Sequence, residues 1–240
     1  MCTLFFEREH VEPYLSLMLI GFLVLLSVEA CMANEDIYRL PQPVGEQEAC
    51  LTRILHARRT IRSFSPRSLS QIQVARLLWA AQGVTSPEGY RTAPSAGALY
   101  PLELHLVTGN VQGLPSGSYR YDPARHALRA AVPGDIRRAI AKAALNQSWI
   151  ARVPAVVVIS GIESRTTAKY GRRGARYVQM EVGHAAQNLL LQAVALGLAG
   201  AIVGAFDDNS LKRLLQLPGE ERPLAILSVG HPISEASLEQ

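Results

Sequence analysis

Apolar positions recur with helical or strand-like periods over most of the chain. From about Gly174 to Gly197 they return at spacings of three and four, which predicts one long helix. This helix is apolar over most of its girth, so we expect it at the centre of the fold or at an interface. Ser70 is a good N-cap for a second helix, which Gly83 ends. Shorter helices are expected over 46–57, 135–145 and 207–215.

Short apolar runs predict the strands of a sheet. Residues 102–108 alternate between apolar and polar, and residues 155–160 are rich in Val and Ile, as in a buried strand. Residues 118–121 and 127–131 are typical of a hairpin. Strands and helices do not alternate strictly, which favours an α+β fold with helices on a mainly antiparallel sheet. Two further strands are expected over 200–206 and 224–229.

The N-terminal segment has features of a targeting sequence. Residues 14–28 are apolar and uncharged, about the length of a signal-peptide core and short for a membrane span of ~20 residues. We therefore expect residues 1–33 to be a signal peptide or membrane anchor, the only part that meets a membrane. Residues 34–240 would then form a mature domain on the periplasmic side, after a polar linker over 34–46. The alternative is a helix packed on a cytoplasmic domain.

Net charge and cysteine content limit the kinds of partner, disulfide and metal site that we expect. The net charge is +4, and it becomes +7 without residues 1–30, which hold four acidic residues and one basic residue. A basic domain suits anionic partners such as phosphates, but no interleaving of aromatic and basic residues predicts nucleic-acid binding. Beyond the first 33 residues, Cys50 is the only cysteine, so we expect no internal disulfide and no zinc site.

Three segments carry candidate chemistry. Arg58, Arg59 and Arg62 surround Thr60 and could clamp an oxyanion through bidentate hydrogen bonds, although a solvated basic loop is the alternative. Next, the small residues of the irregular segment 91–101 would let a flat ring approach the backbone.

The third segment, 197–207, is rich in glycine. Its glycines precede and end the predicted strand instead of linking a strand to a helix. They are therefore not a dinucleotide-binding fingerprint.

Taken in this order, the three segments resemble the nitroreductase family, and most closely its SagB/ThcOx-like dehydrogenase branch, over residues 53–232. The resemblance implies an FMN-binding oxidoreductase whose fold is an intertwined homodimer with two flavin sites at the interface. It implies that Arg58, Arg59 and Thr60 hold the phosphate and ribityl group, with Arg62 near N1 and O2.

The resemblance also implies residues around the flavin ring. The backbone at Gly204 and Ala205 would face N5, and His231 would add a little to phosphate binding. Gly204 stands where typical nitroreductases often carry an acidic residue, so nitroarene specificity does not follow. Four residues would line the ring from the neighbouring subunit: Pro94, Ser95, Ala96 and Gly97.

A Lys–Tyr pair precedes the long helix. In azoline-oxidising members of the branch such a pair acts in proton removal, and Lys169 and Tyr170 match it by residue type. A lysine among cationic groups can act as a base. The alternative is an ordinary basic loop before a helix.

A polar stripe lies on the long helix itself. Glu181 and His184 have the Glu-x-x-His spacing of di-iron bundles, but no second copy is present within residues 34–240. A buried hydrogen-bonded network at a dimer interface is the favoured interpretation. Tyr177 and Asn188 share the same helix face.

These patterns leave three functions to compare. The leading hypothesis is an FMN-dependent oxidoreductase that passes hydride through flavin N5, from NAD(P)H to a small nitro or quinone-type acceptor. The alternative is a SagB/ThcOx-like dehydrogenase or oxidase of a peptide or heterocyclic substrate, re-oxidised by oxygen. Lys169, Tyr170 and export to a compartment with little NAD(P)H favour the alternative. A non-catalytic module that binds flavin or another anion is the third.

Overall fold

The computed structural model describes residues 37–41 and 51–233. One seven-stranded sheet in this part of the chain has the order β1-β4-β3-β2-β5-β7-β6, and every neighbouring pair is antiparallel. The strands are β1 (Ile37–Arg39), β2 (Leu102–Thr108), β3 (Gly117–Asp122), β4 (Ala127–Pro133), β5 (Ala155–Gly161), β6 (Ala199–Val203) and β7 (Arg222–Gly230). The helices are α2 (Leu51–Ala57), α3 (Gln71–Gln82), α4 (Arg137–Ala143), α5 (Ser164–Tyr170), α6 (Arg173–Ala195) and α7 (Asp208–Leu214), with 3-10 turns η1 (Ala96–Ala98) and η2 (Ser148–Arg152).

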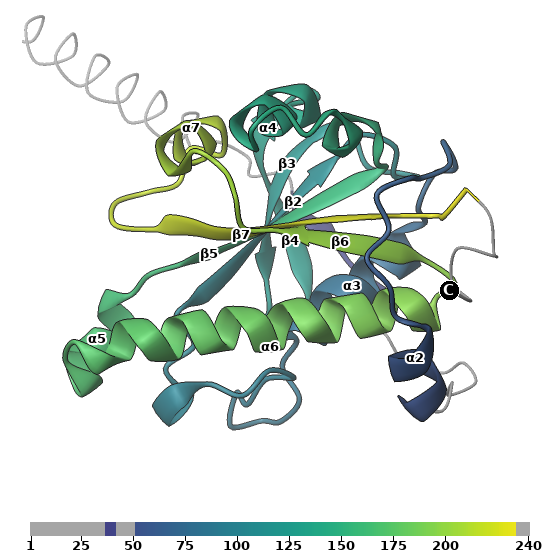
Figure 1. Ribbon diagram of the computed structural model, residues 1–240. Coiled ribbons are helices and arrows are strands. Elements are labelled where there is room, and N and C mark those ends of the chain that lie inside the picture. Colours follow the sequence, from purple (N-terminus) through teal and green to yellow (C-terminus); the bar gives the residue numbers. More distant parts are fainter. Residues whose placement is uncertain (1–36, 42–50, 234–240) are drawn as a thin grey trace, which may run out of the picture. The chain divides into compact units, whose positions relative to one another are not determined.

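Helices cover both faces of the sheet, as Figure 1 shows, with α3 and α6 on one side and α4 and α7 on the other. The interior strand β5 therefore buries every residue. Val157 and Ile159 face the α3–α6 side, whereas Val156 and Val158 face α4 and α7. Burial on both faces explains why this strand is an unbroken apolar run.

The structure confirms most predicted elements. Helix α3 begins after Ser70, whose hydroxyl accepts from the Gln73 N–H at 3.2 Å while the Gln73 side chain accepts from the Ser70 N–H at 2.9 Å. This reciprocal pairing satisfies two N–H groups that a helix start leaves free. Helix α6 ends before Gly197, which has φ +66°. Strand β2 and the hairpin β3–β4 lie where their patterns predicted them.

Three expectations were wrong in detail. Residues 37–39 of the expected linker form edge strand β1, which pairs with β4 through main-chain bonds that side-chain patterns do not reveal. Lys169 and Tyr170, which the alternative placed in an ordinary loop, are the last two residues of helix α5, which an ion pair between Arg165 and Glu103 holds to the sheet. The strand expected over 200–206 ends at Val203, so Gly204 lies beyond it.

The N-terminal predictions fall mostly outside the described residues. This applies to the leader over 1–33 and to the first half of the helix expected over 46–57. Within the described ranges, no helix is long and apolar enough to cross a membrane. The described part of that helix, α2, exposes Leu51 and Leu55 instead of packing them in the core. Their exposed fractions are 61% and 50%.

Candidate functional site

The predicted phosphate-binding segment lies along the edge of the sheet. After α2 the chain runs beside the outer strand β6, where the Ile61 N–H donates to the Gly200 carbonyl at 3.1 Å and Thr60 forms a parallel bridge with Gly200. This pairing holds Arg58, Arg59 and Thr60 next to the start of β6, just beyond the C-terminal end of α6 (Figure 1).

The three guanidinium groups of this segment have unused hydrogen-bond donors. Among the described residues, neither Arg58 nor Arg59 nor Arg62 makes an ion pair. Arg59 donates through Nη1 to the carbonyls of His56 and Arg58, at 2.7 and 3.0 Å, and so caps the C-terminal end of α2. Arg62 is exposed, 6.0 Å from the centroid of the Trp149 ring. Uncompensated guanidinium groups on a fixed backbone fit a phosphate.

Gly204 and Ala205 are exposed immediately after β6. A Cβ atom at Gly204 would meet nothing within 4 Å, so the backbone here is open to a flat group. Four residues of extended strand separate Gly204 from Gly200, roughly 13 Å. The phosphate segment and this open backbone therefore lie along one edge of the sheet.

His231 is placed differently from an exposed phosphate ligand. It is 9% exposed, and its carbonyl accepts from the Ser65 N–H at 2.8 Å. Burial lowers the pKa of its ring, and the charge of Arg67 lowers it further, although a hydrogen bond to the Ser68 backbone opposes them. The backbone and the ring of His231 thus both bind the 65–68 segment.

The predicted ring-binding loop, 91–101, has a strained conformation. Gly97, Ala98 and Tyr100 all have positive φ, at 64°, 54° and 46°. The Ser95 hydroxyl accepts from the Tyr100 N–H at 2.9 Å, and the Arg91 guanidinium lies 4.5 Å from the centroid of the Tyr100 ring. Non-glycine residues in this region persist only where the surroundings impose it, and such strain concentrates at functional sites.

The Lys–Tyr pair meets this loop. A Cβ atom on Gly97 would lie 2.7 Å from Tyr170 Oη and 3.0 Å from Lys169 Nζ. A side chain at this point would have to displace both side-chain ends. The structure thus brings together two predicted groups that are more than 70 residues apart in the sequence.

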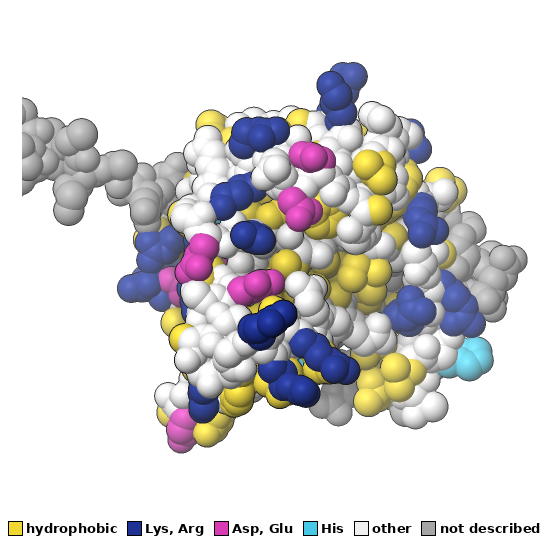
Figure 2. Space-filling model, turned by 60° about the vertical axis from the view of Figure 1, so that its left-hand side comes forward, with side chains coloured by type: hydrophobic (Ala, Val, Ile, Leu, Met, Phe, Trp, Pro, Cys, Tyr) yellow, Lys and Arg dark blue, Asp and Glu magenta, His cyan; other side chains and the backbone are white. Residues whose placement is uncertain are grey.

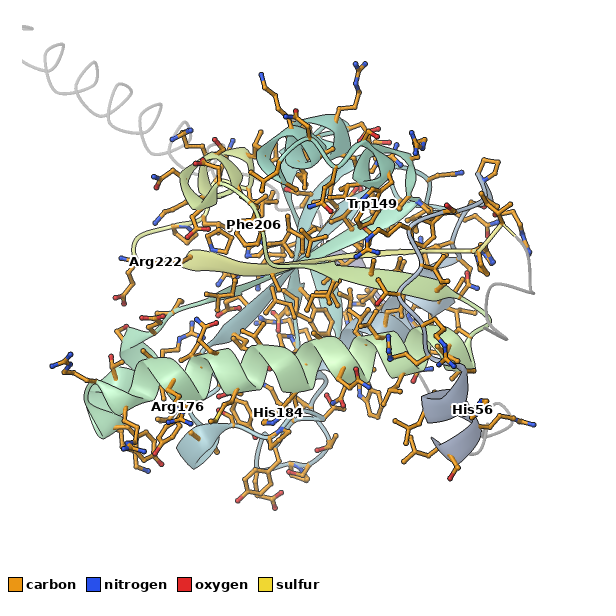
Figure 3. All side chains as sticks on the ribbon, in the orientation of Figure 1. His56, Trp149, Arg176, His184, Phe206 and Arg222 are labelled. Carbon is orange, nitrogen blue, oxygen red and sulfur yellow. The ribbon has the colours of Figure 1, made fainter. Side chains whose placement is uncertain are left out.

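The polar stripe of α6 runs along the same loop. Asn188 Nδ2 donates to the Thr92 carbonyl at 3.2 Å, and the ring of Tyr177 packs edge-on against Tyr170 with centroids 5.2 Å apart. Glu181 lies between them and is 2% exposed. His184 is exposed on the side of α6 turned away from the sheet (Figure 3), so within one chain it takes no part in these contacts. Within the described residues, the other members of the stripe contact the loop and α5.

An ion-pair network anchors α5 and the loop to the sheet. Arg165 pairs with Glu103 at 2.7 Å and donates to the Tyr100 carbonyl at 3.1 Å. Arg120 joins Glu103 to the fully buried Glu221, at 3.2 Å from each. The residues are spread from 100 to 221 without any local pattern, which is why sequence reasoning missed them.

Glu221 also contacts His105 and Ser160, at 2.7 and 2.6 Å. Burial alone would raise the pKa of Glu221, but these hydrogen bonds and the charges of His105 and Arg120 lower it overall. Glu221, His105 and Ser160 are not a catalytic triad. In such a triad the two ring nitrogens of histidine bind the carboxylate and the hydroxyl separately, whereas here the single atom His105 Nε2 contacts both.

The two groups of predicted flavin residues lie far apart within one chain. Ser95 faces Glu181, whereas Thr60 pairs with Gly200 beyond the end of α6 at Ala195. At 1.5 Å per residue, Glu181 and Ala195 are roughly 20 Å apart along the helix. A single bound molecule cannot easily contact both groups in the same chain.

Comparison with known proteins identifies the family. The profile of the nitroreductase family matches residues 55–231. The chain belongs to the nitroreductase family. This membership makes it an oxidoreductase and confirms the predicted fold, an antiparallel sheet flanked by helices.

Individual nitroreductase relatives agree with the match. MJ1384 of Methanocaldococcus jannaschii, which its name assigns to the nitroreductases, is 42% identical over 187 residues, covering 78% of this chain and 93% of the relative. The microcin B17-processing protein McbC of Escherichia coli is 28% identical over 144 residues, covering 58% of this chain and 52% of McbC.

Solved structures share this nitroreductase fold. A crystal structure from Ralstonia eutropha, described as that of a nitroreductase, has a TM-score of 0.74 and 26% identity, covering 84% of this chain and 92% of that one. A chain of the E. coli microcin synthetase McbBCD complex, solved with truncated pro-MccB17 bound, has a TM-score of 0.65 and 22% identity, covering 93% and 95%. At that identity the second likeness concerns the fold alone.

Proposed function

We propose that this nitroreductase-family protein is an FMN-dependent oxidoreductase that works as a homodimer. Each flavin site would take its phosphate clamp from one copy and its ring loop from the other. The observation that carries the proposal is the separation of the two groups along α6, because a shared site reunites them. The exposed apolar residues Leu51, Leu55 and Ile202 near the phosphate clamp suit coverage by a second copy.

The residues present fit FMN by their chemistry. Arg58 and Arg59 have free donors for a phosphate, and the Thr60 hydroxyl is exposed beside them. Arg62 would place positive charge near N1 and O2, and the open backbone at Gly204 would admit the ring edge. When bound, FMN would supply hydride transfer through N5 between NAD(P)H and a small nitro or quinone-type acceptor.

The surface beside the ring loop suits an anionic donor such as NAD(P)H. Figure 2 brings forward the end of the molecule that carries α5 and the start of α6, and Lys and Arg dominate its charged groups. Lys169, Arg172, Arg173 and Arg176 are exposed, and none has an ion-pair partner among the described residues. Such a field attracts phosphate-bearing substrates.

A second candidate function rests on the contact of Lys169 and Tyr170 with Gly97. Here the protein would be a SagB/ThcOx-like dehydrogenase or oxidase of a peptide or heterocyclic substrate, re-oxidised by oxygen, and Lys169 and Tyr170 would move the proton. The match to McbC, which by name processes microcin B17, supports this candidate. Export through residues 1–33 would favour it too, because an exported enzyme meets little NAD(P)H.

The visible spectrum of the purified chain tests these functions. With FMN added, flavin bands that bleach under anaerobic NADH or NADPH would support the reductase. Bands that persist with both donors would favour the second candidate. No bound flavin at any FMN concentration would contradict both.

Mixing two defective variants tests the shared site. One variant carries Arg58→Ala and Arg59→Ala, and the other carries Gly97→Val. If sites are shared, randomly formed heterodimers hold one intact site each, and about a quarter of all sites recover FMN binding. A site built within one chain would recover none.

A further inference from the structure

Arg165 links helix α5 to the strained ring loop. Its Nη1 donates to the Tyr100 carbonyl at 3.1 Å, and its Nη2 pairs with Glu103 at 2.7 Å. One rigid, planar guanidinium thus bridges the end of the loop and strand β2. The main chain adds a further link, because the Ile162 N–H donates to the Pro101 carbonyl at 2.9 Å. Helix α5 therefore begins beside the residue at which the loop ends.

The carboxylate that binds Arg165 is itself held in place. Glu103 is 14% exposed, and its second oxygen pairs with Arg120 at 3.2 Å. Arg120 also pairs with the buried Glu221 at 3.2 Å, so Glu103 is a fixed anchor within a network. The Arg165 side chain, by contrast, is 38% exposed, and an ion pair that open to water contributes little to stability. The importance of Arg165 therefore lies in where it holds the loop.

The carbonyl that Arg165 binds belongs to the strained part of the loop. Tyr100 has φ +46°, a conformation that needs surrounding contacts to persist. Its N–H donates to the Ser95 hydroxyl at 2.9 Å, and its phenol oxygen accepts from the Arg91 N–H at 3.1 Å. These two contacts come from within the loop, whereas the contact of Arg165 comes from α5. Arg165 thus ties the strained turn to a different element.

The same face of α5 carries the lysine of the Lys–Tyr pair. Lys169 follows Arg165 by four residues, which places both on one side of the helix, roughly 6 Å apart along its axis. Lys169 Nζ would lie 3.0 Å from a Cβ atom on Gly97, where the run of positive φ angles begins. Two cations on one helix face therefore meet the two ends of one turn. A shift of α5 along the loop would break the Arg165 bridge.

We propose that Arg165 is a positioning residue that holds α5 against the ring loop, so that the Lys–Tyr pair stands at Gly97. In this role it acts through Lys169 and Tyr170. Without the bridge, the turn relaxes and the pair loses its position beside the loop. The inference rests on the proposed function for what the pair and the loop do, whereas the hold on the loop belongs to the protein alone.

Three variants separate the bridge from simple charge. Arg165→Met keeps an unbranched side chain without any donor, and Arg165→Lys keeps the charge on a single nitrogen instead of a fork. The matched control is Arg125→Met, which breaks an exposed ion pair with Asp122, 2.9 Å long, next to the β3–β4 hairpin turn. Each variant should lower the melting temperature by no more than about 4 °C, because exposed ion pairs contribute little to stability.

The first measurement is hydrogen exchange over residues 95–100 and 165–171 in the flavin-free full chain. The Ala98 N–H donates to the Ser95 carbonyl at 3.0 Å, so its exchange reports opening of the turn. We expect both segments to exchange about tenfold faster in Arg165→Met than in wild type, because a hydrogen bond from a charged donor is lost. Arg165→Lys should resemble Arg165→Met, and the control should match wild type. Wild-type exchange in either Arg165 variant would overturn the proposal.

The second measurement is reoxidation of the chemically reduced, FMN-loaded protein by a small quinone, followed by the return of flavin absorption. We expect Arg165→Met to lower the limiting rate about tenfold and to leave the half-saturating quinone concentration within about twofold of wild type, because Arg165 acts on position. In a Lys169→Met background, adding Arg165→Met should cause less than about a twofold further loss. Losses that multiply would show that Arg165 does not act through the pair.

The outcomes separate this proposal from the proposed function. If no protein binds FMN, the proposed function fails, and hydrogen exchange alone decides whether Arg165 holds the loop. If FMN binds but exchange and reoxidation are the same in wild type and Arg165→Met, the function stands and the positioning role fails. If Arg165→Met does not fold, Arg165→Lys decides, because wild-type exchange and reoxidation in that variant refute the bridge.

Discussion

Replacing Gly97 by alanine tests the meeting point of the ring loop and the Lys–Tyr pair. Gly97 has φ +64°, and its added Cβ atom would lie 2.7 Å from Tyr170 Oη and 3.0 Å from Lys169 Nζ. The left-handed conformation costs an L-residue roughly 1–2 kcal/mol, partly offset because alanine restricts the unfolded chain. The net loss is about 1 kcal/mol, or about 2–4 °C in melting temperature for a domain of this size.

Gly89→Ala is the matched control for this substitution. Gly89 has φ +83°, and a Cβ atom there would meet nothing within 4 Å. It therefore carries a similar backbone penalty without touching either side chain. Because Tyr170 and Lys169 contact Gly97 through the ends of flexible side chains, their displacement should add little to the loss of stability.

The functional effects of the two variants should differ sharply. A displacement of about 1 Å in a positioned group can lower turnover by about a hundredfold. We expect Gly97→Ala to lose ten- to a hundredfold in steady-state turnover of the FMN-loaded protein, and Gly89→Ala to keep wild-type turnover. The two alanine variants should have nearly the same melting temperature, and adding Tyr170→Phe, which removes the nearest atom, should abolish the small difference that remains. If both variants match in melting temperature and turnover, Gly97 does not meet the pair and the reasoning is refuted.

Three further predictions concern other parts of the molecule. Arg58→Ala should weaken FMN binding about ten- to a hundredfold, because a hydrogen bond to a charged group contributes about 1.5–3 kcal/mol; fluorescence titration measures this, and unchanged affinity would contradict the phosphate clamp. The pKa of Glu221 is lowered on folding, so its ionised form stabilises the fold above the unfolded value of 4.5, and this contribution is lost as pH falls through the folded pKa. Glu221→Gln should therefore lose about 3 kcal/mol in urea unfolding at pH 7, with a gap to wild type that narrows below pH 4.5; a gap independent of pH would count against the network. Ser70→Ala should lower the free energy of unfolding by about 1 kcal/mol and the melting temperature by about 2–4 °C in scanning calorimetry. An unchanged melting temperature would mean that the capping box does not stabilise the fold.

Much of the fold could be read from short-range patterns. The cap at Ser70, the periodicity of α6 and the apolar run of β5 each depend on residues within one element, and all three predicted the observed elements. Elements held by distant partners could not be read this way. Strand β1 exists because β4 offers it main-chain bonds, and α5 is held by an ion pair between Arg165 and Glu103, 62 positions apart.

The candidate site likewise has parts that the sequence predicted and parts that only the structure shows. The sequence by itself determined the family, the arginine cluster that begins at Arg58, and the small-residue loop, because each is a contiguous motif. Only the tertiary structure decided that Gly97 meets Tyr170, that Glu181 is buried against Ser95, and that the two groups of flavin residues lie at different points along α6. The physical reason is that burial of a polar group and contact across many residues depend on how elements pack, and no local pattern of side chains encodes that packing.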